Sequence, residues 1–453
     1  MAPGARRARG TVLIVTMWIL LVLAGLVLDL ARAVRVEGDC SANQAAALRA
    51  GAVQEGAIQN VLANVDGLDG QVPEDADVPC EAVRVGDGLF WILRPDTEDD
   101  RTYAFGITDE MSKVNLNTAS QDMLAMLPDM TEELAASIAD WRDADSDITA
   151  GGAESEYYLL LADPYECKSG PFETVDELLL VRGATPGILY GQDANRSGVL
   201  DPGEDTTLVT ISSGSGSRLD RGIAGFVTLY GTKAEPTAGG VALVNVNDPQ
   251  QSGALADLLR EAVGQDRLPG ILDRAFRGRP FQSVLDFYLR TGLTSSEFQQ
   301  VANKITTTAE GQQVALINVN TAPREVLLCL PGLEDADVSA LLSARAASGT
   351  DRTNVAWVAE VLSPATAEAI GGFITTQSYF FSADIVSLAG NGRAFRRCRV
   401  VVDARQSPPR VVYRQDLTHL GWPLSPDILT ELRAGTPVDE IAQTTNQGVV
   451  QRW

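Results

Sequence analysis

The residues of this chain best suited to chemistry lie at 193–204 (DANRSGVLDPGE). Oxygen donors stand at positions one, three, five, seven, nine and twelve of this segment, and a glycine stands at six, which is the spacing of a calcium-binding loop. The predicted metal ligands are Asp193, Asn195, Ser197, Val199 (through its backbone carbonyl), Asp201 and Glu204. A metal-free surface turn rich in Asp and Gly is the alternative. Because the flanking segments are poor helices, a structural calcium staple fits better than a signalling switch.

A second group of carboxylates lies earlier in the chain and has no recognised ligand spacing. Its members are Asp143, Asp145, Asp147, Glu154 and Glu156. A solvated acidic loop and a second calcium site are both open interpretations, and the missing spacing favours the acidic loop.

The composition argues against catalysis and against nucleic-acid binding. The single histidine, His419, lies in a polar stretch, so Ser-His-Asp or Cys-His chemistry has one candidate base in a poor setting. We therefore predict that the chain is not an enzyme and has no catalytic residues and no organic cofactor. A formal net charge of −24 repels phosphate backbones, so nucleic acid is not expected as a partner, whereas divalent cations and basic protein surfaces are.

The five cysteines do not form a C-x-x-C pair, which argues against a zinc ribbon and a thioredoxin-like motif. Cys329 and Cys398 lie in apolar patterns typical of buried thiols. Cys40 and Cys80 flank the first helix of the body and are the pair best suited to a disulfide, although the pairing is left open.

The elements that must position these residues begin with a membrane segment. Three arginines within residues 6–9 precede Gly10, and Thr11–Leu28 then runs without a charge, which is long enough to cross a bilayer. A secretory signal peptide has its small-residue cleavage site after the apolar run, whereas here the small residue stands before it. Cleavage between Gly10 and Thr11 would remove the arginines and keep the helix, as in a type IV pilin-like leader. A plain membrane anchor is the alternative, and in both cases the body lies beyond an inner membrane.

The leader lacks one residue that pilin-like subunits usually carry. Their fifth mature position is a glutamate, which pairs with the N-terminal amine of the next subunit and would otherwise be a costly charge in an apolar bundle. If Thr11 is the first mature residue, the fifth is Val15. A subunit without this glutamate suits the tip of a filament, where no further subunit has to be held.

Beyond the membrane segment the pattern predicts a helix and a split sheet. Small apolar residues recur at three- and four-residue steps between 46 and 61, which indicates one buried helix face ending near 64–70. Strands are expected at 89–93, 102–107, 380–388, 396–402 and 410–414, with a hairpin signal at 390–392. The expected organisation is a leader (1–10), a transmembrane helix (11–28), a pilin-like helix with the first strands (29–112), an inserted α-helical region (113–375), returning strands (376–417) and a polar tail (418–453). The tail is expected to be a docked helix near 425–434 or largely without structure.

The helical insert contains internal repeats. Asn-Thr-Ala phrases begin at Val114 (VNLNTA) and Ile317 (INVNTA), and a weaker copy begins at Val244 (VNVND). A second phrase recurs at 171–178 (PFETVDEL) and 280–287 (PFQSVLDF). Asparagines that bond to local backbone, followed by Thr118 or Thr321 as a helix N-cap, make each unit a short helical hairpin. DNA-binding helical hairpins begin similarly, but the acidic turns of this chain favour a structural role.

Taken together, these residues resemble the K-type minor pseudopilin of the type II secretion system (general secretion pathway protein K). The matching segments are the RG-TVLIV leader, 113–120 (KVNLNTAS), 141–145 with 152–159, 177–183 (ELLLVRG) and 317–322 (INVNTA). The resemblance implies an α+β fold, in which a pilin-like long N-terminal helix and a small antiparallel sheet carry a large inserted helical-hairpin (SAM-like) domain. This chain departs from the family in the middle repeat, around 193–231 and after Arg414, where it is longer than the family pattern.

The resemblance also implies a function. The chain would be a minor pseudopilin at the tip of a periplasmic pseudopilus, where it initiates and caps assembly for the export of folded proteins. The implied partners are the I- and J-type minor pseudopilins, the major pseudopilin, and the prepilin peptidase that cleaves the leader, with methylation of the new terminus. Calcium is implied in the helical domain. The alternatives are a type IV pilus minor pilin or tip adhesin, and a calcium-dependent membrane-anchored enzyme.

Overall fold

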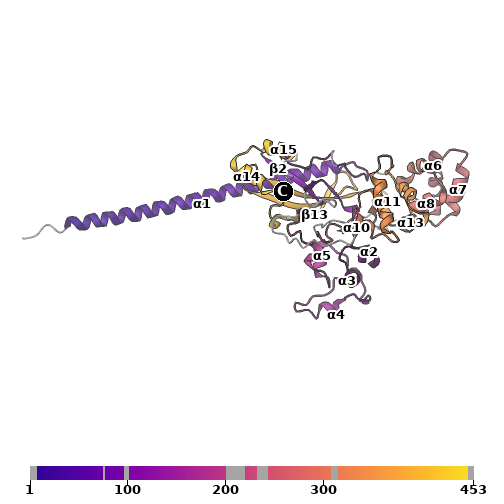
Figure 1. Cartoon of the computed structure of the whole chain (residues 1–453), viewed down its shortest axis with the longest axis horizontal. Helices are drawn as coiled ribbons and strands as arrows, with labels where there is room; N and C mark the ends of the chain where they lie inside the picture. The colour runs from indigo at the N-terminus through magenta and orange to yellow at the C-terminus, as the bar shows by residue number, and fades with distance from the viewer. Residues whose placement is uncertain are drawn as a thin grey trace, which may run out of the picture.

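A single long helix joins the membrane segment to the body. The computed structural model describes residues 8–74, 77–95, 102–199, 220–231, 243–307 and 315–446. Helix α1 (Ala8–Val65) contains 58 residues, and its first half projects away from the rest of the molecule (Figure 1). The projecting part has a mean hydropathy of 2.6 over its most apolar window and is long and apolar enough to cross a membrane. The second half of α1 buries a face formed by Ala46, Ala50, Val53, Ala57 and Val61, as the spacing predicted.

A seven-stranded sheet packs against the second half of α1. Its main path runs β1 (Val83–Val85), β2 (Gly88–Arg94), β11 (Phe380–Leu388), β12 (Phe395–Asp403) and β13 (Arg410–Asp416), all antiparallel. The predicted strand 102–107 is instead two short pieces, β3 (Ala104–Phe105) and β4 (Thr108–Asp109), which pair with β2 and β11. The register places Ile385 beside both Ile92 and Cys398. Strands β2 and β11, nearly 300 residues apart in sequence, are therefore neighbours in the sheet.

The two faces of the sheet are covered by different elements. Alternate residues, including Ile92, Ile385 and Cys398, pack against α1. The other face carries Trp91 and packs against α14 (Pro426–Ala434) and α15 (Val438–Asn446). Of the two expectations for the tail, the docked helix near 425–434 is therefore the one that the structure has.

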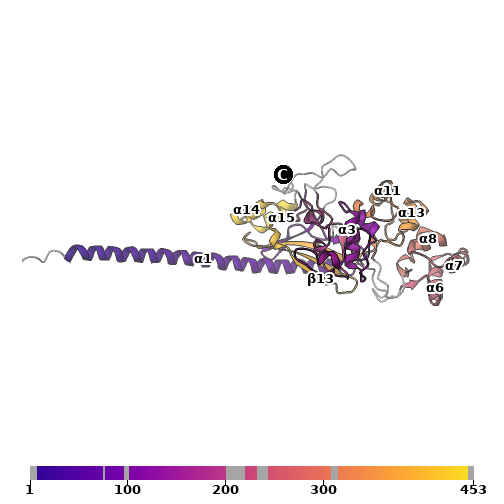
Figure 2. The ribbon, with the colours of Figure 1, turned by 90° about the horizontal axis from the view of Figure 1, so that it is seen from below.

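The helical insert between β4 and β11 consists of three modules, each closed by a short parallel ladder. Module one (114–228) begins with β5 (Val114–Asn115) and ends with β6 (Val227–Thr228), which pair with each other. Module two (244–306) is closed by β7 (Val244–Asn245) and β8 (Ile305–Thr306), and module three (317–375) by β9 (Ile317–Asn318) and β10 (Ile374–Thr375). Every closing strand is a Val-Thr or Ile-Thr dipeptide. Module two lies at the end of the body farthest from the projecting half of α1 (Figure 1 and Figure 2).

Short helices fill the three modules. Module one contains α2 (Gln121–Ala125), α3 (Glu132–Arg142), α4 (Ser155–Tyr158), the turn η2 (Val175–Leu180) and α5 (Pro186–Tyr190). Module two contains α6 (Ser252–Ala262), α7 (Leu268–Arg277), α8 (Val284–Thr291) and α9 (Ser295–Gln299). Module three contains α10 (Arg324–Leu327), α11 (Asp335–Ala346), α12 (Ala356–Val361) and α13 (Pro364–Ile370).

The paired asparagines explain why the two sequence phrases recur together. The first asparagine of each module accepts a hydrogen bond from the backbone N–H two residues later, as Asn115 does from Asn117 at 2.8 Å. In modules one and two, the second asparagine exchanges two hydrogen bonds with the backbone of the Pro-Phe phrase, whereas in module three Asn320 donates to the Arg352 carbonyl at 2.9 Å. Asn117 exchanges both bonds with Phe172 at 3.1 and 2.8 Å, and Asn247 with Phe281 at 2.8 Å in both directions. The asparagine side chain of one phrase is therefore the hydrogen-bond partner of the backbone of the other phrase.

The predicted N-caps of the first and third modules are wrong. Helix α2 is capped by Ser120, whose hydroxyl accepts from the backbone N–H of Met123, and Pro323 precedes α10 without a side-chain cap. Thr321 instead donates its hydroxyl to Asp109, at the junction with the sheet. In both modules the N-cap lies two residues later than predicted, at 120 instead of 118 and at 323 instead of 321.

The expected disulfide between Cys40 and Cys80 is incompatible with the fold. Cys40 is exposed on α1, whereas Cys80 is buried and follows Pro79, whose carbonyl accepts from Asn60 at 3.5 Å. Twenty helical residues separate Cys40 from Asn60, which is about 30 Å along the axis. A disulfide requires the two Cα atoms to lie within about 7 Å.

Candidate functional site

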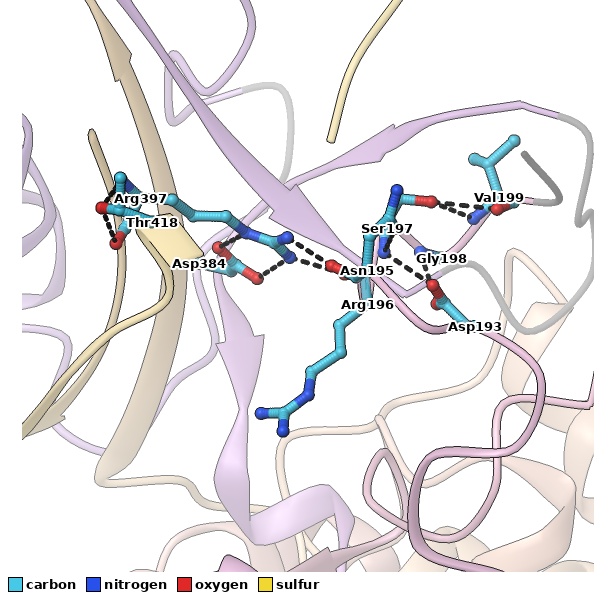
Figure 3. Close-up of polar contacts among 9 residues, drawn as sticks. All are labelled: Asp193, Asn195, Arg196, Ser197, Gly198, Val199, Asp384, Arg397 and Thr418. Carbon is cyan, nitrogen blue, oxygen red and sulfur yellow. Dashed lines mark hydrogen bonds and ion pairs between the residues drawn. The ribbon is translucent and has the colours of Figure 1, made fainter. Parts of the chain in front are cut away.

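The described half of the predicted calcium loop is folded around the Asp193 carboxylate. This carboxylate accepts from the backbone N–H of Ser197 at 2.9 Å and of Gly198 at 2.8 Å (Figure 3). The Asn195 side-chain oxygen accepts from the same Ser197 N–H at 2.8 Å, so positions one and three of the loop meet at one amide. Gly198 has a φ of +78°, the left-handed turn that position six requires. Asp201 and Glu204 lie outside the described residues.

The loop interior has the electrostatics of an oxygen-ligand site. Asp193 and Ser197 are each only 5% exposed. Burial raises the pKa of the Asp193 carboxyl, opposed by the amides of Gly198 and Ser197 that bond to it. The Ser197 hydroxyl donates to the Val199 carbonyl at 2.9 Å, so two further predicted ligand atoms are neighbours. A buried carboxylate beside hydroxyl, amide and carbonyl oxygens is a donor set that suits a hard cation such as Ca²⁺.

Arg397 attaches this loop to the sheet, and the sequence analysis did not single it out. Its side chain is 0% exposed and donates to the backbone carbonyls of Asn195 and Arg196, the latter at 2.6 Å. The same guanidinium binds the Asp384 carboxylate through two bonds of 2.9 and 2.7 Å (Figure 3). Arg397 lies opposite Val386 in the β11–β12 register, so it extends from the face of the sheet opposite α1.

A second polar connection ties module one to the sheet near the loop. Asp176 on η2 accepts from the Tyr190 hydroxyl and from the Gln415 side chain on β13, the latter at 2.8 Å. The guanidinium of Arg196 lies 3.7 Å from the centre of the Tyr190 ring. The loop is therefore held on both sides by residues from the sheet or from the helix that precedes it.

In the second acidic group, burial raises the pKa of Asp143, and the nearby charges of Asp145 and Asp147 raise it further. Asp145, Asp147 and Glu156 are exposed, whereas Glu154 is buried. Burial raises the pKa of Glu154, and the charge of Asp143 adds to the effect. Within the described ranges, no three His, Cys, Asp or Glu side chains are placed to hold a metal ion.

Asp109 and Glu110 form a buried polar junction that sequence reasoning missed. Asp109 accepts hydrogen bonds from Asn318 at 3.0 Å, Thr321 at 2.6 Å and Ser378 at 2.5 Å, so one carboxylate contacts both the beginning of module three and the segment just after it. Burial raises the pKa of Asp109, and these hydrogen bonds oppose the shift. The sequence around Asp109 (TDEMSK) looks like a surface turn because these three side-chain partners of Asp109 lie more than 200 residues away.

Glu110 joins module one to the sheet at the same junction. It binds Lys113 at 2.6 Å and Arg399 of β12 at 2.9 Å. It also accepts from the hydroxyls of Thr228 and Ser382, both at 2.5 Å. Burial opposes ionisation of Glu110, but Lys113 and Arg399 outweigh it and lower the pKa well below its usual range.

The remaining predicted residues lie away from these contacts. Gly10 and Thr11, the predicted processing site, are in the first turn of α1. Val15 is 55% exposed, and His419 is exposed in the turn η6 (Thr418–Leu420), which follows β13.

Comparisons with known proteins match two of the three modules. Residues 113–190 and residues 317–370 each match a sequence model described as type II secretion system (T2SS), protein K. A solved structure, the GspK–GspI–GspJ complex of the type II secretion system from enterotoxigenic Escherichia coli, is 13% identical over 84% of this chain and 99% of that chain, with a TM-score of 0.41. No curated protein matches the chain. The two matched segments begin at the Asn-x-Asn turns of modules one and three, and over these segments the chain is similar to protein K of the type II secretion system.

Proposed function

We propose that this chain is a minor pseudopilin at the tip of the type II secretion pseudopilus, where it initiates and caps assembly for the export of folded proteins. The match of modules one and three to protein K carries the proposal. Helix α1 supports it, because an apolar, exposed first half and a second half packed on a sheet are what a membrane-held pilin subunit needs.

The proposal places the chain in the inner membrane with its body in the periplasm. Prepilin peptidase cuts between Gly10 and Thr11, and the new N-terminus is methylated. N-terminal sequencing and mass measurement of the native polypeptide should give methylated Thr11 as the first residue. A chain that begins beyond Leu28 would have lost the membrane segment and would contradict the proposal.

The tip position rests on Val15, which stands where other subunits carry a glutamate. No carboxylate is available there to pair with the terminal amine of a following subunit. Wild-type chain, labelled in assembled pseudopili, should be found at one end only. Labelling along the filament body would refute the tip assignment, and Val15→Glu is the variant expected to enter the body.

We propose the I- and J-type minor pseudopilins and the major pseudopilin as direct partners, through the exposed face of α1. On the uncovered side of α1 beyond the membrane run, Val34 and Leu48 are 60% and 71% exposed. Partner helices covering these side chains would remove that apolar surface from water. Leu48→Glu should therefore abolish co-purification with the I- and J-type subunits. Leu160→Glu, at an 87% exposed position of module one, is the matched control that should not.

We also propose that the loop Asp193–Glu204 binds one structural Ca²⁺. Asp193, Asn195 and Ser197 would contribute side-chain oxygens, Val199 its carbonyl, and Asp201 and Glu204 the remaining oxygens. Calorimetry on the full chain in detergent should detect one calcium site. Glu204→Ala should remove the heat, and Glu156→Ala, in the second acidic group, should leave it. Heat that survives Glu204→Ala but not Glu156→Ala would move the site to the second group.

A further inference from the structure

The contact between Arg397 and the loop fixes the peptide units that gather the predicted ligands. The Arg196 carbonyl and the Ser197 N–H belong to one planar, trans peptide unit and therefore point in opposite directions. Arg397 binds that carbonyl at 2.6 Å, while the N–H on the other side donates to Asp193 and Asn195. The side chains of loop positions one and three thus meet at an amide whose orientation is set from the sheet.

The preceding peptide unit is fixed in the same way. The Asn195 carbonyl accepts from Arg397, and the Arg196 N–H on the same unit donates to the Asp193 carbonyl at 3.2 Å. Two consecutive peptide units of the loop are therefore held by one guanidinium. Arginine can do this because its donors form a rigid planar fork, whereas lysine presents a point charge.

Asp384 holds the Arg397 guanidinium in the orientation in which it binds both loop carbonyls. Its two oxygens bind Nε and one terminal nitrogen of Arg397, which leaves the outward N–H groups directed at the loop. Because Arg397 is fully buried, this arrangement exists only while the loop lies on the sheet.

We propose that Arg397, held by Asp384, is a positioning residue for the calcium loop, and that calcium binding is thereby coupled to the docking of module one on the sheet. The inference rests on the calcium site proposed above. An ion that prefers the folded loop also favours the loop backbone that Arg397 binds. By linkage, docking on Arg397 strengthens calcium binding to the same extent.

The test compares two arginines that are each held by a carboxylate and donate to a backbone carbonyl. Arg267 of module two binds Glu297 at 2.6 Å and donates to the Gly292 carbonyl at 2.7 Å. Calcium affinity of the full chain in detergent is measured by calorimetry for wild type, Arg397→Lys and Arg267→Lys. Loss of a residue that orients metal ligands typically weakens metal affinity by about 10- to 100-fold, which is the effect expected for Arg397→Lys. Arg267→Lys should bind calcium as wild type does.

A second measurement uses the unaltered chain, so that it stands even if Arg397→Lys does not fold. Hydrogen exchange is followed by mass spectrometry with and without calcium. Calcium should slow exchange in peptides covering 193–199 and also in peptides covering 384–397 of the sheet, with no change in peptides of module two.

The outcomes separate the inference from the calcium site itself. If wild type gives no heat when calcium is added, both the calcium site and the coupling to Arg397 are refuted. Wild-type binding with an equal affinity in Arg397→Lys, or slowed exchange in the loop without any in the sheet, would overturn the coupling and leave the calcium site standing.

Discussion

Replacing Glu110 by glutamine is expected to destabilise the junction between module one and the sheet. The carboxylate is 2% exposed and faces Lys113, which is 4% exposed, so the substitution leaves a buried ammonium without its counter-charge. Breaking a buried ion pair by removing one partner costs about 3–5 kcal/mol. Arg399 is 31% exposed and stays hydrated, and glutamine still accepts from one hydroxyl, so we expect the lower end, about 3 kcal/mol.

The pH dependence gives this prediction a second, independent signature. Burial opposes the ionised form of Glu110, but the charges of Lys113 and Arg399 together lower its pKa below the ordinary value of 4.5. A lowered folded-state pKa contributes stability that is present above the unfolded-state pKa and is lost as the pH falls towards the folded-state value. The difference between wild type and Glu110→Gln should therefore be complete at pH 7 and smaller once the pH is below 4.5.

Urea unfolding of the full chain in detergent, followed by tryptophan fluorescence at pH 7 and below pH 4.5, measures both effects. Glu55→Gln is the matched control, because Glu55 pairs with Arg414 at 3.4 Å but is 57% exposed. Such an exposed pair contributes less than about 1 kcal/mol. Equal losses in the two variants, or a Glu110→Gln loss that does not change with pH, would refute the assignment of a buried, charge-paired Glu110.

Three further substitutions test other parts of the structure by the same unfolding measurement. Asn117→Ala removes both hydrogen bonds to Phe172 and should lower the free energy of unfolding by about 1–3 kcal/mol; an unchanged value would contradict the bridging role. Leu432→Ala leaves a cavity between α14 and the sheet and should cost about 2–5 kcal/mol, whereas a negligible cost would mean that the tail is not docked. Asp109→Asn mimics the neutral acid: because burial raises the folded-state pKa of Asp109, wild type loses stability as the pH rises above 3.8, and the variant should lose less. A steeper loss in the variant would contradict this sign.

Periodic elements could be predicted from the sequence because one face of each is apolar. The buried face of α1 follows helical spacing from Ala46 onward, and strand β12 alternates Cys398, Val400 and Val402 onto the α1 side. The fold of 193–198 could also be predicted in outline, since the turn needs a glycine at one position and short polar side chains before it.

The residues that the sequence did not reveal are polar groups buried by distant segments. Arg397 and Arg399 occupy the alternate face of β12, which would point to solvent in a sheet covered on one side only. Module one lies against that face, so that Arg397 is fully buried and Arg399 is partly buried. The two-residue ladders were missed for a different reason: Val114–Asn115 is too short to carry any periodicity, and its partner is 113 residues away.

Each module begins and ends at neighbouring residues of one short ladder, so the polypeptide enters and leaves the module at the same place. A segment with adjacent ends can be lengthened, shortened or exchanged by recombination without moving the flanking framework. Changes within a module therefore leave α1 and the sheet in place. Module two, outermost and outside the two matched segments, is where such a change would disturb the rest of the fold least.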